Sequence, residues 1–373
     1  VVTRWPATLC DGQMLPALGE TWEDTAVTLA AKLPAGRYTD ALSGRGIEDL
    51  PAIGAKAAQL AELMRVNTQR EGCSASPIAV PAGAFAIPMA HYLDHMQSSG
   101  ANTKLAALQK QASFQNDPAV RERELKAVRQ LILEHPVDAS LLAQVQEEMA
   151  ARFGNQRVRF RSSSNAEDLQ GFNGAGLYTS AGAELDDADF AVDTALRTVW
   201  ASLWESRAYD ERSYARIVHD AVAMGVLVHA AFRSERANGV AMSRNLNDLT
   251  RSDQFFVNAQ IGEASVTNPA PGVGTEQLIY TWPPLTPELT VRSRSTLTNG
   301  APVLEPAKVR ELVCALGALH DHFKAVLDPT DENRWFTMEV EFKLMGDERK
   351  LFIKQARPFP FATADLPADC RGR

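Results

Sequence analysis

The chain has 373 residues, of which 45% are hydrophobic and 23% are charged, proportions typical of a globular protein with two domains or two lobes. Its formal net charge is -8 and its lysines and arginines form no dense cluster, which argues against a nucleic-acid-binding protein. No apolar run approaches the roughly 18 residues that a membrane-spanning helix needs, so we expect a cytoplasmic protein without a membrane segment.

Residues 1–45 are predicted to form an N-terminal extension, with one short helix over residues 21–32. The chain starts with Val1 rather than methionine, which is consistent with a processed product or a piece of a longer protein. A second helix is predicted to start near Gly54, because apolar residues then recur at helical spacing. Lys56 falls in its first turn, where a lysine can add a charge to an anion site; a solvated surface lysine is the alternative.

Residues 102–153 are predicted to be a helical insert that serves packing rather than chemistry. Apolar residues form helical stripes along this segment, and the stripes are interrupted at Asp117-Pro118 and His135-Pro136.

Residues 157–179 combine a strand pattern with a polar, glycine-rich loop. Val158 and Phe160 alternate with Arg159 and Arg161, which is the period of a half-buried strand. Three serines, an acidic pair and several glycines follow. An arginine offers a fixed fork of donors, and glycine N–H groups can approach phosphate oxygens closely, so the stretch suits a polyanion site. Taken alone, it equally fits a basic edge strand with a flexible loop.

The remaining elements are predicted from periodicity and composition. Residues 186–217 and 306–326 are expected to form long helices. Strands are expected over residues 221–232, 239–245, 255–267 and 276–281.

A hairpin is predicted to close the chain, turning at Gly346-Asp347. Glu339 and Glu341 lie two residues apart on its first strand, so their carboxylates face one side at about 7 Å, a spacing that suits Mg²⁺. Strict alternation on the return strand assigns one side to Leu351, Ile353, Gln355 and Arg357, and the other side to Lys350, Phe352 and Lys354.

Five segments, in this order, resemble the nucleotide-binding domain shared by phosphoenolpyruvate synthase, pyruvate phosphate dikinase and rifampicin phosphotransferase. They are GAKAAQL at residues 54–60, VPAGAF at 80–85, RSSSNAEDL at 161–169 with the glycine loop up to Thr179, VWASLWESRAY at 199–209, and EVE at 339–341 with LFIKQARP at 351–358. The resemblance covers residues 50–358, most of the chain.

The resemblance implies an α/β (α+β) fold of the ATP-grasp type, in which two lobes clamp ATP between them. Residues 46–217 would form the first lobe with the helical insert, and residues 218–360 the second lobe with a metal-binding hairpin. Residues 361–373 would be a tail.

The resemblance also assigns roles to individual residues. Lys56, Arg161 and Arg357 would act on the phosphates during catalysis, beside the loop that contains Gly174 and Thr179. Further nucleotide contacts would come from Glu263 near the ribose, from Gln355, and from His229. His229 stands where the family has glutamine, which leaves selectivity for adenine open. Glu339, which replaces the family's aspartate, and Glu341 would hold Mg²⁺.

The resulting hypothesis is a Mg-ATP-binding phosphotransferase module of dikinase type. It would pass a phosphoryl group from ATP to a histidine on a separate domain, in cis if the chain is a fragment, or on a partner protein. None of the seven histidines has the context of that phosphocarrier, and the final acceptor stays open. The alternative is a catalytically inactive nucleotide-binding or interaction domain. The residues that would indicate it are those that differ from the family, namely His229, Glu339 and Gly54-Ala55.

Overall fold

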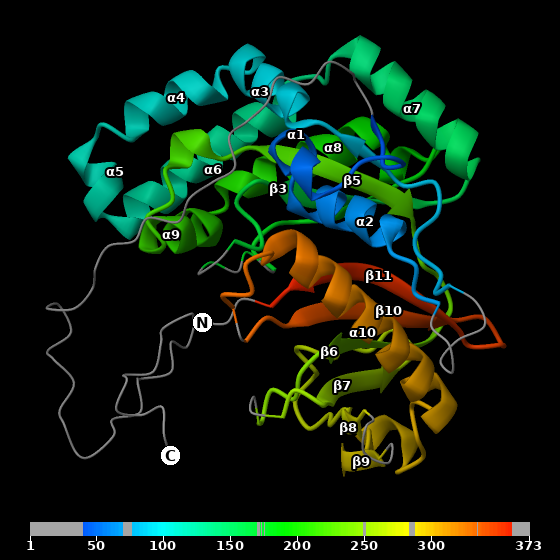
Figure 1. Cartoon of the computed structure of the whole chain (residues 1–373). Helices are drawn as coiled ribbons and strands as arrows, with labels where there is room; N and C mark the ends of the chain where they lie inside the picture. The colour runs from blue at the N-terminus through cyan, green and yellow to red at the C-terminus, as the bar shows by residue number, and fades with distance from the viewer. Residues whose placement is uncertain are drawn as a thin grey trace, which may run out of the picture.

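The structure, a computed structural model, describes residues 40–69, 77–169, 172, 174, 176–248, 251–282, 288–333 and 335–359. The predicted helix at residues 21–32 and the tail at 361–373 lie outside these residues. Two antiparallel sheets with their helices are stacked one above the other (Figure 1). No helix in the described part of the chain is long and apolar enough to cross a membrane.

The first sheet carries the predicted arginine strand near its centre. Its order is β1 (Asp40–Ala41), β2 (Phe85–Ile87), β5 (Met224–Ala230), β3 (Val158–Ser164) and β4 (Ala181–Ala183). Val158 and Phe160 on β3 are buried on one face, whereas Arg159 and Arg161 lie on the other, so the predicted alternation is confirmed.

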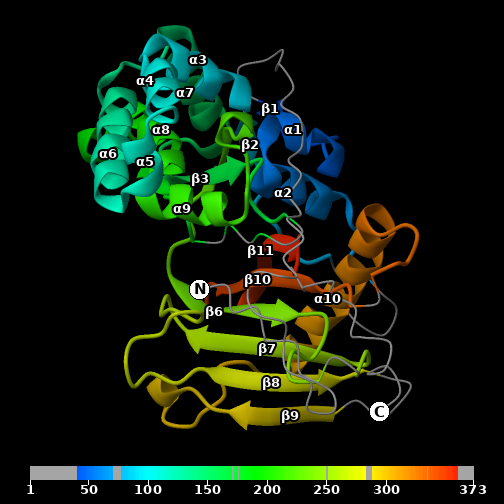
Figure 2. The same ribbon diagram turned by 90° about the vertical axis from the view of Figure 1, so that its left-hand side faces the viewer.

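Helices cover the apolar face of this sheet and bury a core between them (Figure 2). They are α3 (Met89–Ser98), α4 (Ala101–Leu108), α5 (Ala112–Asn116), α6 (Pro118–Glu134), α7 (Ala139–Phe153), α8 (Val192–Ala201) and α9 (Ser206–Tyr214). The insert at residues 102–153 is therefore helical, as predicted. The Asp117 carboxylate caps the N-terminus of α6 by accepting from two backbone N–H groups, and Pro118 occupies the first helical position.

The prediction of one long helix over residues 186–217 is wrong. The segment is divided into α8, the short 3₁₀ turn η3 (Ser202–Trp204) and α9, with extended backbone at Glu205. The break leaves the carbonyl of Leu203 without a helical partner, and the guanidinium of Arg212 donates to it at 2.8 Å. Periodicity does not reveal such a break, because the bond that compensates for it comes from a side chain nine residues away.

The second sheet contains the predicted hairpin and three further predicted strands. Its order is β11 (Lys350–Pro358), β10 (Met338–Met345), β6 (Glu235–Met242), β7 (Gln254–Ile261), β8 (Glu276–Thr281) and β9 (Glu288–Ser293), which run side by side in Figure 2. The long helix α10 (Pro306–Leu327) packs Leu312, Leu316 and Phe323 against it, confirming the amphipathic helix predicted at 306–326.

A β-bulge in β11 changes which residues face the first lobe. Glu341 pairs with Gln355, but the next residue of β10, Phe342, pairs with Ile353, so Lys354 is an extra residue. Gln355 and Arg357 consequently lie opposite Glu341 and Glu339, on their side of the sheet. The strict alternation expected for the return strand, which placed Gln355 and Arg357 with Leu351 and Ile353, is therefore wrong.

The helix that carries Lys56 joins the two sheets. The short α1 (Leu50–Ile53) leads through Gly54 into α2 (Ala55–Arg65). Ala57, Leu60 and Leu63 of α2 share one apolar core with Leu227 of β5 above and Val340 and Leu351 of the hairpin below. Strand β5 lies in the first sheet, so the chain crosses between the sheets after Ala230 rather than at residue 218. The domain boundaries stay a prediction.

Candidate functional site

The start of α2 packs closely against β3 through a glycine and is hydrogen-bonded to it through a serine. Gly54 has φ 82°, and a Cβ built there would lie 1.7 Å from the carbonyl oxygen of Ser163, so no side chain fits. The Ser163 hydroxyl donates to the Ile53 carbonyl at 2.8 Å and accepts from the Ala57 N–H at 3.0 Å. Because α2 is held this closely, the side chain of Lys56 reaches the end of β3.

Lys56 is held there by an acidic residue that the sequence analysis did not assign. Its Nζ lies 2.5 Å from Oε1 of Glu167 and donates to the Ser162 hydroxyl at 3.3 Å. Glu167 is buried, and its other oxygen accepts from the Ser164 N–H at 3.0 Å. Burial raises the pKa of Glu167 although the charge of Lys56 opposes the shift. The lysine is thus fixed in position beside the strand end.

Arg161 reaches across to the second sheet. Its Nη2 donates to Oε1 of Gln355 on β11 at 3.0 Å, so a neutral amide faces this guanidinium. This bond joins residues 194 positions apart in the chain and unites two predicted site residues. The hydrogen bond between Arg161 and Gln355 depends on the bulge, because strict alternation would turn Gln355 to the opposite face of the sheet.

Arg357 is held by one carboxylate from each lobe. Its Nη1 lies 2.8 Å from Oδ1 of Asp168, in the loop after β3, and its Nη2 lies 2.7 Å from Oε1 of Glu339. Burial opposes the charged form of Arg357, but these two carboxylates outweigh it and raise its pKa. Asp168 has left-handed backbone, with φ 54°, and its Oδ2 is buried without a hydrogen-bond partner among the described residues. The second oxygen of Asp168 thus keeps an unused capacity to accept a hydrogen bond within the described part of the chain.

The second predicted metal ligand, Glu341, forms an ion pair with the bulge residue. Its Oε2 lies 2.6 Å from Nζ of Lys354. Burial would raise the pKa of Glu341, but the charges of Lys354 and Arg161 outweigh burial and lower this pKa to about 2. Glu341 is therefore a carboxylate at any physiological pH.

The contacts described above join acidic and basic side chains in equal number. Four are basic, namely Lys56, Arg161, Lys354 and Arg357, and four are acidic, namely Glu167, Asp168, Glu339 and Glu341. The sequence analysis missed Glu167, Asp168 and Lys354 as members. The adjacent pair Glu167-Asp168 was a visible signal, but its partners lie on other elements, which a linear pattern does not reveal.

His229 lies on the same face of the first sheet, opposite Arg159 on β3. Its Nδ1 lies 2.8 Å from the Ala230 carbonyl oxygen, which fixes the proton on Nδ1, and its buried Nε2 has no partner among the described residues. Burial, reinforced by the charge of Arg161, lowers the pKa of His229 to about 3. The ring is therefore neutral and presents one unused acceptor.

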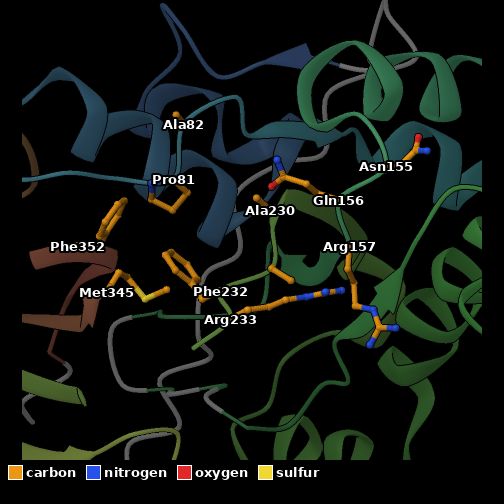
Figure 3. Close-up of a pocket in the computed structure, with 11 residues that line it drawn as sticks. Pro81, Ala82, Asn155, Gln156, Arg157, Ala230, Phe232, Arg233, Met345 and Phe352 are labelled. Atoms are coloured by element: carbon orange, nitrogen blue, oxygen red, sulfur yellow. The ribbon is translucent and has the colours of Figure 1, made fainter. Parts of the chain in front are cut away.

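A cavity of about 540 Å³ lies at the crossing between the sheets (Figure 3). It is lined by Phe232, whose ring centre lies 5.8 Å from that of His229. Phe232, Phe352 and Met345 gather on one side of it, and Gln156 and Arg157 lie toward the other. The volume falls within the range of small-molecule sites, and its mixture of apolar and polar lining is usual for them.

The other predicted binding residues lie in loops. Gly174 is buried, and a Cβ built there would lie 3.2 Å from Cγ of Glu167, so its backbone packs against the residue that holds Lys56. Thr179 is exposed at the end of the same loop. Glu263 lies in an exposed turn after β7, and none of the contacts described above involves its side chain.

The donors present fit a magnesium ion that is held together with a phosphate ligand. Among the described residues, no group of three or more His, Cys, Asp or Glu side chains could hold a metal ion. Magnesium in nucleotide sites usually takes one or two protein carboxylates and completes its shell with water and phosphate oxygens. Glu339 and Glu341 offer such a pair, and the assignment stays a prediction.

Comparison with known proteins gives a family match over most of the chain. Residues 50–368 match the family model described as "Pyruvate phosphate dikinase, AMP/ATP-binding domain". A phosphoenolpyruvate synthase from Pseudomonas aeruginosa is 24% identical over 353 residues, which cover 86% of this chain and 42% of that protein. The phosphoenolpyruvate synthase of Escherichia coli is 25% identical over 332 residues, with coverage of 84% and 40%.

A third relative, the phosphoenolpyruvate synthase of Pyrococcus furiosus, is 27% identical over 275 residues, covering 68% of this chain and 33% of that protein. The chain thus spans less than half of the length of each of these relatives.

Proposed function

The chain belongs to the pyruvate phosphate dikinase AMP/ATP-binding domain family, and from this premise we propose that it is a Mg-ATP-binding phosphotransferase module of dikinase type. It would pass a phosphoryl group from ATP to a histidine on a separate domain or partner. The observation that carries the proposal is the convergence of Lys56, Arg161 and Arg357, which come from both lobes, on one junction.

In this proposal the basic side chains take up the charge of the phosphates. Phosphoryl transfer depends mainly on positioning and on neutralising charge, and fixed guanidinium groups supply both. Arg161 is the best placed of them, because it donates to the neutral amide of Gln355 and has no ion pair with another described residue that phosphate would have to replace. Arg357 and Lys56 would exchange a carboxylate for a phosphate oxygen.

The carboxylates next to these basic side chains suit the cation that accompanies ATP. Glu339 and Glu341 would hold Mg²⁺, with Asp168 next to them through Arg357. When bound, the ion would neutralise charge on the phosphate oxygens. The low pKa of Glu341 keeps one carboxylate ready at neutral pH.

The base would lie on the other side of Arg161, next to His229 and the cavity of Figure 3. The unused Nε2 acceptor of His229 fits a donor on the base edge, such as the amino group of adenine. The apolar side chains of Phe232 and Phe352 offer surfaces on which a planar ring can pack.

Calorimetric titration of ATP with Mg²⁺ into the intact chain tests the binding step. We expect clear binding, and a loss of at least tenfold in affinity for Arg161→Ala. The matched control is Arg123→Ala, which removes the same charge from an exposed position on α6 and should bind like the wild type. No binding by the wild type would refute the proposal.

The transfer step needs a second measurement. Nucleotide products should form from ATP when a histidine-bearing carrier domain is added, and not when its histidine is replaced by alanine. Binding of ATP without any turnover would favour the catalytically inactive alternative instead.

A further inference from the structure

We propose that Arg212 and Tyr178 are a positioning pair that sets Glu167 and the loop around Gly174 and Tyr178 for nucleotide binding. The inference rests on the proposed nucleotide site and adds two residues that lie behind it. Neither residue is among those to which the sequence analysis gave a role.

Arg212 is a buried charge whose hydrogen bonds within the described part of the chain are to neutral groups. Its side chain on α9 is fully buried. Its guanidinium donates to the Leu203 carbonyl at 2.8 Å and to the Tyr178 hydroxyl at 3.2 Å, and it lies 5.4 Å from the centre of the Trp204 ring. Burying a cation without an ion-pair partner costs free energy. We therefore infer that this arginine has a role beyond packing.

One end of Arg212 is fixed by the scaffold. The Leu203 carbonyl that it contacts is left over from the break between α8 and α9, and both helices pack in the core of the first lobe. The other end of the guanidinium points to Tyr178, in the loop between β3 and β4. Arg212 thus connects the helices of the first lobe to Tyr178 and fixes the position of its hydroxyl relative to them.

From Tyr178 a series of contacts leads to Lys56. The side chain of Ser164 lies close enough to the Tyr178 hydroxyl to lower its pKa. The backbone N–H of Ser164 donates to Glu167 at 3.0 Å, and Glu167 lies 2.5 Å from Nζ of Lys56. The charges of Arg212 and Glu167 both act on the Tyr178 hydroxyl, the first lowering and the second raising its pKa.

Charge and burial explain why this hydroxyl is suited to the link. Burial raises the pKa of Tyr178, opposed by the charge of Arg212, so the hydroxyl stays protonated and can both donate and accept. The backbone of Gly174, in the same loop, packs against Glu167, so a displacement of Glu167 also moves the loop. Loss of the Tyr178 hydroxyl should therefore loosen Lys56 and the loop together.

Tyr178→Phe tests the inference, because it removes the hydroxyl and keeps the ring that packs against the core. The matched control is Tyr92→Phe in the same lobe, where the lost hydroxyl accepts from the Trp204 indole at 2.9 Å. Each variant leaves one buried N–H donor without its acceptor. We expect similar decreases in melting temperature for both, but about a tenfold rise in the Kd for Mg-ATP for Tyr178→Phe alone.

A double-mutant cycle with Arg212→Lys completes the test. A lysine keeps the charge but cannot donate to Leu203 and Tyr178 in the same fork geometry, so it should weaken ATP binding like Tyr178→Phe. If the two residues act as one unit, the double variant should bind about as weakly as either single variant.

The outcomes separate this inference from the proposed function. Wild-type binding together with unchanged affinity in Tyr178→Phe, an equal loss in Tyr92→Phe, or additive losses in the double variant would overturn the positioning role alone. Absence of ATP binding by the wild type would overturn the proposed function and this inference with it.

Discussion

Replacing Gly54 with alanine should destabilise the protein far more than a glycine-to-alanine change usually does. Gly54 has φ 82° and ψ 170°, a region that is essentially restricted to glycine, and forcing another residue into it costs on the order of 1–3 kcal/mol. In addition, the new Cβ would lie 1.7 Å from the Ser163 carbonyl oxygen, so α2 has to move away from β3.

The movement removes the two hydrogen bonds of the Ser163 hydroxyl, to Ile53 and Ala57, which contribute about 1 kcal/mol each. We therefore expect Gly54→Ala to lower the free energy of unfolding by about 3–5 kcal/mol, a large part of the total for a typical domain. Urea denaturation followed by tryptophan fluorescence measures this. Because Lys56 moves with α2, the folded fraction should also bind Mg-ATP more weakly.

Gly100→Ala is the matched control. Gly100 also has positive φ, 73°, but a Cβ built there meets no atom within 4 Å. Gly100→Ala should therefore lower the free energy of unfolding by only about 1 kcal/mol, the cost of left-handed backbone for a residue with a Cβ. If Gly54→Ala cost no more than Gly100→Ala, the close approach of α2 to β3 would not matter for stability, and our account of how Lys56 is positioned would be refuted.

Three other changes have outcomes that follow from contacts described above or from burial. The pKa of His229 falls from 6.5 to about 3 on folding, so between these pH values the unfolded chain binds one more proton than the folded chain. The free energy of unfolding therefore decreases as the pH falls. In urea titrations at pH 7 and pH 5, His229→Gln should make this decrease smaller by about 2 kcal/mol. Asp117→Ala should cost about 1 kcal/mol in the same assay by uncapping α6. Glu276→Ala should cost about 3 kcal/mol, because this fully buried carboxylate accepts from the N–H groups of Val303 and Leu304.

Each of these three predictions can be contradicted, and two of them have a matched control. An equal acid-induced loss in wild type and His229→Gln would contradict the role given to His229. Asp117→Asn keeps a capping oxygen and should be nearly neutral. Glu311→Ala removes a carboxylate from a partly exposed pair with Lys308 and should cost at most about 0.5 kcal/mol, so a similar cost for Glu276→Ala would count against the buried network.

The sequence predicted those parts of the fold that depend on local periodicity. The alternation at Val158 and Phe160 and the apolar stripe at Leu312, Leu316 and Phe323 each follow from burying one face of a single element. The family resemblance added the order of these elements along the chain. For this reason the arginine strand, the helical insert and the closing hairpin could be expected before the structure was known.

The predictions that were wrong concern features that the periodicity of a sequence does not indicate. A single extra residue at Lys354 reverses the faces of the rest of β11, and no local pattern indicates it. The break before α9 is stabilised by Arg212, which a helical pattern counts as one more helical residue. The carboxylate of Asp168 pairs with Arg357 across 189 positions, so its place in the site is a property of the assembled lobes.

The shared core around α2 has a consequence for how the chain is made. Leu60 and Leu63 are synthesised well before Val340 and Leu351, with which they share one apolar core. Until that hairpin has been synthesised, α2 can pack against the first sheet but not against these later neighbours. The nascent protein thus carries a partly uncovered apolar helix while the intervening residues are made, the kind of species that holding chaperones bind. Folding of α2 onto both sheets therefore waits for the hairpin, and the cluster that includes Lys56 can form only after Arg357 has been synthesised.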